Sequence, residues 1–129
     1  WLEGGGRADA TYERDGVSGL TLLMGAAMHG QERMVDLLLR HGAKINQQNS
    51  EGVTALMLAA HHGHERVVDL LIRHGAEVNL QSSDGVTALM RAAIGGHERV
   101  VELLIRHGAE VNLQSSKGFT ALMTAALFN

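Results

Sequence analysis

One unit of 33 residues recurs along this chain, and this period limits the folds open to the chain more than any other feature. Each copy is marked by a glycine two positions before a threonine, at Gly19, Gly52, Gly85 and Gly118. Residues 52–84 and 85–117 differ at only five of their 33 positions. A period of this length predicts a supersecondary unit stacked on copies of itself, because such a unit buries its apolar face only against a neighbour.

Each unit carries the signals of two short helices joined by a tight turn. In residues 49–81, Thr54 precedes a run of good helix formers, and its hydroxyl is suited to accept a hydrogen bond from an amide of the first turn. That run ends at Gly63, and Glu65 then places an acid in the first turn of a second helix, where the helix dipole favours it. We therefore expect Thr54 to cap the first helix of this unit.

The second helix is expected to be buried on most of its sides. Its charged residues fall on one stripe, whereas apolar residues 67–68 and 70–72 cover the rest. Truncation of Leu70 or Leu103 to alanine is therefore expected to destabilise the chain. Beyond this helix, residues 76–81 read as an extended stretch and 82–85 as a tight turn, so each unit should project a hairpin-like finger.

The composition excludes several classes of function. Among 129 residues there is no cysteine, which removes disulfides and thiolate metal sites, and the net charge of −3 offers no basic stripe for nucleic acid. No apolar run approaches the roughly 20 residues that cross a bilayer. We expect an intracellular module, cytoplasmic or nuclear, that binds neither nucleic acid nor membranes.

The repeated residues resemble the ankyrin repeat, whose pattern joins T-P-L-H-x-A-A to G-H, a hydrophobic second helix and L-L-x-x-G-A-D-V-N. In the second unit the matching residues are Thr54, Leu56, Ala59, Ala60, Gly63, His64, Val67, Val68, Leu71, Ile72, Gly75, Ala76, Val78 and Asn79. The third unit repeats them, and the first repeats most of them. The resemblance covers residues 18–129.

Two positions depart from the family pattern in every copy. The proline after the threonine is replaced by Leu22, Ala55, Ala88 and Ala121. The histidine of the same motif is replaced by Met24, Met57, Met90 and Met123. We expect these methionines to fill space between repeats by apolar packing in place of a hydrogen bond, rather than to form a soft-metal or cofactor site.

The resemblance implies an all-α fold, an ankyrin-type helical repeat solenoid with short β-hairpin-like fingers. We predict repeats at 18–48, 49–81 and 82–114 and an incomplete repeat at 115–129, all in one domain. Two interpretations remain for residues 1–17. They form a cap, with Trp1, Leu2 or Tyr12 folded over the first repeat, or they are a segment partly of cloning origin. Because Trp1 is an improbable start, we expect the chain to be cut from a longer protein.

The family also implies a function, since ankyrin arrays bind other proteins through their finger tips and concave face and perform no chemistry. Four of the five positions that differ between the second and third units lie on the finger or the first helix. We therefore predict a non-catalytic module for a polypeptide partner of unknown identity. The predicted contacts are Glu51, Val53, His61, His62, Asp84, Val86, Arg91, Ile94, Lys117 and Phe119.

An alternative function is assembly. The last copy stops where its second helix should begin, and Leu122, Leu127 and Phe128 leave its end apolar. Self-association through these residues, or a continuing parent chain, would cover that end. The near identity of the repeats also fits an engineered, consensus-like scaffold.

Other readings of single motifs are weaker. Five of the eight histidines occupy repeated positions, so we interpret His61, His62 and His64 as stacked or hydrogen-bonded turn residues rather than as a metal site. Residues 4–6 lack the strand, helix and Lys-Ser/Thr pair of a phosphate cradle, and no serine stands beside a fixed base. We expect no cofactor, metal or catalytic residue. Asn79 and Asn112 resemble sites of asparaginyl hydroxylation in ankyrin arrays, although structural hydrogen bonding explains them better.

Overall fold

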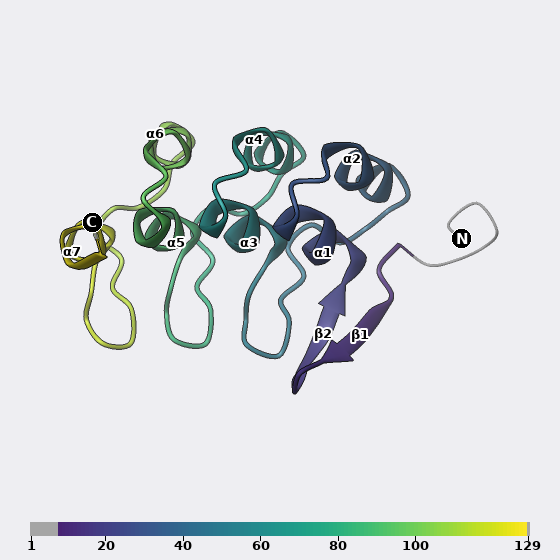
Figure 1. Cartoon of the computed structure of the whole chain (residues 1–129), viewed down its shortest axis with the longest axis horizontal. Coiled ribbons are helices and arrows are strands. Elements are labelled where there is room, and N and C mark those ends of the chain that lie inside the picture. Colours follow the sequence, from purple (N-terminus) through teal and green to yellow (C-terminus); the bar gives the residue numbers. More distant parts are fainter. Residues whose placement is uncertain (1–7, 129) are drawn as a thin grey trace.

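The computed structural model describes residues 8–128, and of Phe128 only the backbone. Its helices form two rows along the chain (Figure 1). The inner row consists of α1 (Leu22–Met28), α3 (Ala55–His61), α5 (Ala88–Gly95) and α7 (Ala121–Phe128). The outer row consists of α2 (Glu32–Arg40), α4 (Glu65–Arg73) and α6 (Glu98–Arg106). The expected helical repeat solenoid is therefore confirmed. None of the described helices has the length and apolar character needed to span a membrane.

Threonine caps start the inner helices, as expected. The Thr54 hydroxyl accepts a hydrogen bond from the Met57 amide at 3.3 Å, and its backbone is extended. The same bond recurs in the neighbouring repeats at 3.1 Å for Thr21 and 3.2 Å for Thr87. These hydroxyls are buried, so each bond satisfies two polar groups that would otherwise lack water.

The core runs as a ribbon between successive inner helices. Met24, Met57 and Met90 are at most 2% exposed, which confirms the expected apolar packing for these three, whereas Met123 of the last repeat is 48% exposed. In the outer row, the fully buried leucines are Leu38, Leu71 and Leu104, each 0% exposed. Leu70 and Leu103, which the sequence suggested, are only partly buried because they flank the buried stripe.

Histidines at the start of the outer helices join one repeat to the next. The Nε2 atom of His64 lies 2.8 Å from the carbonyl oxygen of Met28, and that of His97 lies 2.9 Å from the carbonyl oxygen of His61. A Cβ atom at Gly63 would lie 2.5 Å from the His97 ring, so only glycine leaves room for this contact. The first repeat has Gln31 at this position. The interpretation is confirmed for His64, which is hydrogen-bonded, and for His62, which stacks on it. The Nδ1 atom of His61 is buried without a hydrogen-bond partner among the described residues.

The fingers also pair with one another. The Ser83 amide donates to the Glu51 carbonyl at 2.9 Å, and the Ser116 amide donates to the Asp84 carbonyl at 2.7 Å. Within a finger, the Asn49 side chain accepts from the amides of Glu51 and Val53 at 2.9 and 3.0 Å, which holds the turn. The tips are thus fixed relative to each other by backbone and side-chain hydrogen bonds.

Only the first finger forms regular strands in the part of the chain that the structure describes. Strands β1 (Thr11–Arg14) and β2 (Val17–Thr21) are antiparallel, with Arg14 opposite Val17. The two residues between them, Asp15 and Gly16, have φ of 52° and 82°, the positive values that a tight hairpin turn requires. Tyr12 lies opposite Leu20 in this hairpin, whereas Trp1 and Leu2 of the expected cap lie outside the described residues.

Candidate functional site

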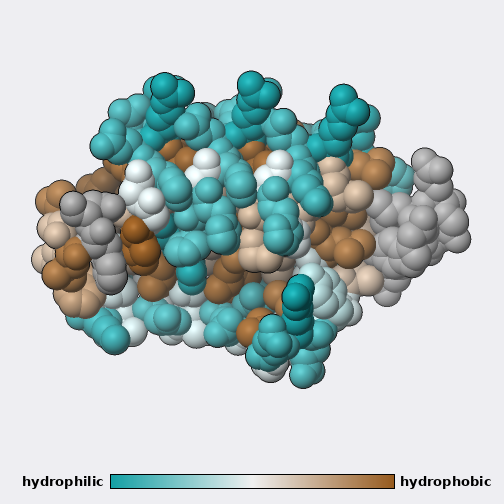
Figure 2. Space-filling view, viewed as in Figure 1, coloured by the Kyte–Doolittle hydropathy of each residue, from teal (hydrophilic) through white to brown (hydrophobic). Residues whose placement is uncertain are grey.

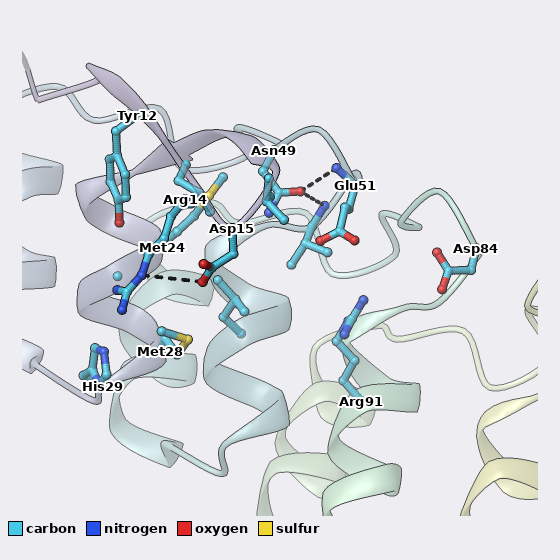
Figure 3. Close-up of a pocket in the computed structure, with 15 residues that line it drawn as sticks. Tyr12, Arg14, Asp15, Met24, Met28, His29, Asn49, Glu51, Asp84 and Arg91 are labelled. Carbon is cyan, nitrogen blue, oxygen red and sulfur yellow. Dashed lines mark hydrogen bonds and ion pairs between the residues drawn. The ribbon is translucent and has the colours of Figure 1, made fainter.

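A groove of about 620 Å³ lies where the first hairpin meets the inner helices (Figure 3). The hairpin forms one wall, α1 and α3 form the floor, and the next two finger tips with α5 form the far side. It is lined by Tyr12, Arg14, Asp15, Val17, Leu20, Met24, Gly25, Met28, His29, Asn49, Glu51, Val53, Leu58, Asp84 and Arg91.

The missing side chain at Gly25 deepens this groove. Gly25, Leu58, Arg91 and Thr124 occupy one position in successive repeats, and only the first of them has no side chain. A Cβ atom at Gly25 would have a single neighbour outside the local chain within 4 Å, the Tyr12 hydroxyl at 3.5 Å. A hollow is therefore left above α1, beside the ring of Tyr12.

The floor of the groove is apolar. Met24 is 1% exposed, and Leu20, Met28 and Leu58 are half-buried around it. Val53, predicted as a partner contact, is only 7% exposed, because its finger turns it onto the inner helices, where it joins the core. It also contributes to the groove lining, so its contact with a partner stays a prediction.

The rim of the groove is charged. The adjacent residues Arg14 and Asp15 form an ion pair at 3.8 Å where the hairpin turn begins. Arg91 points toward the finger tips that carry Glu51 and Asp84 (Figure 3), yet among the described residues no ion pair joins it to either carboxylate. Its Nε atom is buried without a hydrogen-bond partner there. Burial lowers the pKa of Arg91, and Asp84 and Glu51 oppose that effect.

Histidine rings gather at the turn after α3. The rings of His61 and His62 meet edge to face at 5.0 Å, and those of His62 and His64 stack at 6.1 Å. Burial lowers the pKa of His61, with Arg91 and His97 adding to the effect. Burial also lowers the pKa of His62, followed by the surrounding imidazoles. Within residues 8–128 no three His, Asp or Glu side chains come together as ligands for a metal ion.

The structure groups the predicted contacts unequally. Glu51, Val53, Asp84 and Arg91 line the groove. Outside the lining are half-buried Val86 and Ile94 and exposed Lys117 and Phe119, which lie in the third and fourth repeats. His61 and His62 lie in the second repeat, at the turn after α3, and do not line the groove either. The sequence suggested Tyr12 only as part of a cap over the first repeat, and it gave no role to Arg14 and Asp15. The Asp15-Gly16 pair was the available signal for their hairpin.

Asn79 holds two repeats together. Its Oδ1 atom accepts from the Glu110 amide at 2.8 Å, and its Nδ2 atom donates to the Gly108 carbonyl at 3.0 Å. Asn46 makes the first of these contacts one repeat earlier, accepting from the Glu77 amide at 2.8 Å. The structural explanation is therefore confirmed for Asn79, while Asn112 is exposed on the following finger.

The sequence was compared with models of known protein families. A family model described as "Ankyrin repeats (3 copies)" matches residues 2–82 and 68–129. No curated protein matches the chain. The two matched ranges together contain every helix of both rows, the hairpin and all the groove residues. The chain therefore belongs to the ankyrin repeat family.

Proposed function

We propose that this chain is a non-catalytic module that binds a polypeptide partner along the groove and the finger tips beside it. Ankyrin repeats are in general protein–protein interaction modules. The observation that carries the proposal is that three charged residues of the groove, Arg91, Glu51 and Asp84, form no ion pairs among the described residues. They lie beside a half-buried apolar floor. A polypeptide supplies both the apolar side chains and the hydrogen-bond acceptors that such a surface lacks.

The repeats themselves supply conservative variants to test this proposal. Arg91→Leu installs the residue of the second repeat, and Asp84→Lys installs the residue of the next finger, so both changes place a side chain that the fold already holds elsewhere. Glu102→Asp is the matched control, because it makes the same kind of exchange on the outer helix α6. All three variants should keep the unfolding midpoint within a few degrees, since they lie at least partly on the surface.

Binding partners for this test come from a library of displayed protein fragments selected on the unchanged chain. Arg91→Leu and Asp84→Lys are expected to weaken the selected fragments by roughly tenfold or more, the scale of a lost charged contact at an interface. Glu102→Asp is expected to bind them unchanged. Equal affinities for all three variants, or failure to select any fragment, would remove the basis of the proposal.

Self-association is a second candidate function, favoured by the exposure of α7. Leu122 is 79% exposed, whereas Leu56 and Leu89 at the same position of earlier repeats are 2% exposed. Leu127 is 62% exposed and Met123 48%, and Figure 2 shows hydrophobic residues gathered at this end of the array. The side chain of Phe128, also assigned to this contact, lies outside the described residues. These apolar groups suit a second copy packed against α7.

Sedimentation velocity over a range of concentrations tests this second candidate. We expect a monomer–dimer equilibrium that Leu122→Glu shifts fully to monomer, because a buried carboxylate in an apolar contact is strongly unfavourable. Arg33→Glu on the outer helix α2 changes a charge at the other end of the array (Figure 1) and should leave the equilibrium in place. A chain that stays monomeric at every concentration would exclude self-association through α7.

A further inference from the structure

We propose that the hollow above Gly25 takes one bulky apolar side chain of a partner peptide, and that Glu51 and Asp84 bind a basic residue of the same peptide. This inference rests on the proposed function and specifies the partner that the groove selects. It assigns to the first repeat, with its hairpin, a distinct role from the otherwise similar repeats that follow.

The first argument is that the fold does not require glycine at position 25. Gly25 lies inside α1 and has no positive φ, unlike the glycines of the turns. Glycine in a helix is about 1 kcal/mol less favourable than alanine. The only neighbour of an added Cβ, the Tyr12 hydroxyl at 3.5 Å, is at ordinary van der Waals distance. The glycine therefore lowers helix stability and leaves space beside the groove floor.

The second argument is the chemistry of that space. Leu20, Met28 and Leu58 are half-buried around it, so their remaining exposed surface is apolar and gains by contact with another apolar side chain. Tyr12 is 43% exposed and closes the hollow on the hairpin side (Figure 3). Its ring offers an apolar face to an inserted side chain. Its hydroxyl is the atom nearest to Gly25, 3.5 Å from the position of an added Cβ, and can bond to a polar group of the bound peptide.

The third argument is the charge of the rim. Arg14 and Asp15 pair with each other, which leaves Glu51, Asp84 and Arg91 with one excess negative charge. That excess favours a basic side chain on the partner and disfavours phosphate-rich ligands. The guanidinium of Arg91 points toward the same finger tips (Figure 3), where its terminal NH₂ groups can donate to a carbonyl of the bound peptide. The same three residues thus select a basic peptide and hold its backbone.

The test uses short random peptides displayed on phage and selected on the unchanged chain. We expect the selected peptides to share a Leu, Met, Phe or Trp residue a few positions from a Lys or Arg. One such peptide, made synthetically, is then measured by fluorescence anisotropy against Gly25→Leu, which fills the hollow. Its affinity should fall roughly ten- to hundredfold, the contribution of one buried side chain of leucine size. Gly25→Ala, which adds only the Cβ atom, should bind within a few fold of the unchanged chain.

Thermal unfolding separates a blocked hollow from a damaged fold. Both Gly25 variants should unfold at or above the temperature of the unchanged chain, since each replaces a helical glycine by a better helix former. The contact with the basic residue is tested by two changes. One is the double variant Glu51→Gln, Asp84→Asn of the chain, and the other is a peptide whose basic residue is replaced by Gln; binding is measured for each change and for both together. Each change alone should weaken binding severalfold, and the two together should add little, because they remove one interaction.

The outcomes distinguish this inference from the proposed function. If Gly25→Leu binds the selected peptide as tightly as the unchanged chain while Arg91→Leu weakens it, the hollow is not the apolar site and the proposed function stands. If the selected peptides lack the apolar and basic pair, the inference is overturned as well. If no peptide is selected and no protein fragment is selected either, the proposed function itself fails.

Discussion

Replacement of Leu71 by alanine is expected to lower the free energy of unfolding by about 2–5 kcal/mol, as truncation of a fully buried leucine does. Leu71 is 0% exposed in the second half of α4, a helix that contacts α3 of its own repeat and α2 and α6 of the adjacent repeats. The space left by the missing atoms cannot close, because helices on both sides hold their spacing through the His64 and His97 contacts. Urea unfolding followed by far-ultraviolet circular dichroism measures the loss.

Leu70→Ala is the control for this prediction. It removes the same atoms from the preceding position of the same helix, where the side chain is only partly buried. Its effect should be clearly smaller than that of Leu71→Ala, since less apolar surface is exposed to water by the change. A larger loss for Leu70→Ala would mean that α4 is rotated about its axis relative to the arrangement described above.

Replacement of Gly52 by alanine is the second change with a large expected effect. Gly52 has φ of +74°, and an added Cβ would lie 2.9 Å from the Ser83 nitrogen and 3.1 Å from the Ser82 backbone. The left-handed conformation alone costs an alanine about 1–2 kcal/mol. Because the colliding atoms are backbone atoms of the next finger, relief of the contact would break the bond from the Ser83 amide to the Glu51 carbonyl.

Gly75→Ala separates these two contributions. Gly75 also has a positive φ, +94°, but a Cβ built there meets nothing within 4 Å. Gly75→Ala should therefore lose only the free energy that the left-handed conformation costs an alanine. Gly52→Ala should lose this free energy and, in addition, the cost of the clash with the next finger. Both are measured by urea unfolding of the single variants. Equal losses would show that the fingers are not packed against each other in solution.

The sequence predicted the repeated elements well because their signals are local. Thr54 stands directly before its helix and bonds to an amide three residues away, so the cap can be read from a short window. The packing of the methionines and the role of the turn histidines could be predicted because each occupies the same position in several repeats, next to the same neighbouring residues. The existence of both helix rows needed no information beyond the period and these short patterns.

The groove could not be predicted because it depends on contacts between distant parts of the chain. A glycine at position 25 does not by itself indicate a binding site. The hollow above it becomes evident only from the structure, in which Tyr12 lies over Gly25. The orientation of Val53 is set by the finger, which the Asn49 side chain fixes through two amides. Leu70 and Leu71 are adjacent apolar residues, and a rotation of α4 by less than a third of a turn decides which one is fully buried.

The most direct test of the central claim, that a polypeptide binds along this groove, is a ¹H–¹⁵N titration of the labelled chain with a selected peptide. The claim predicts that the amides of Gly25, Glu51, Asp84 and Arg91 shift on binding, while those of Arg33, Arg66 and Arg99 on the outer helices stay in place. Shifts concentrated on the outer helices, with the groove amides unmoved, would contradict the claim.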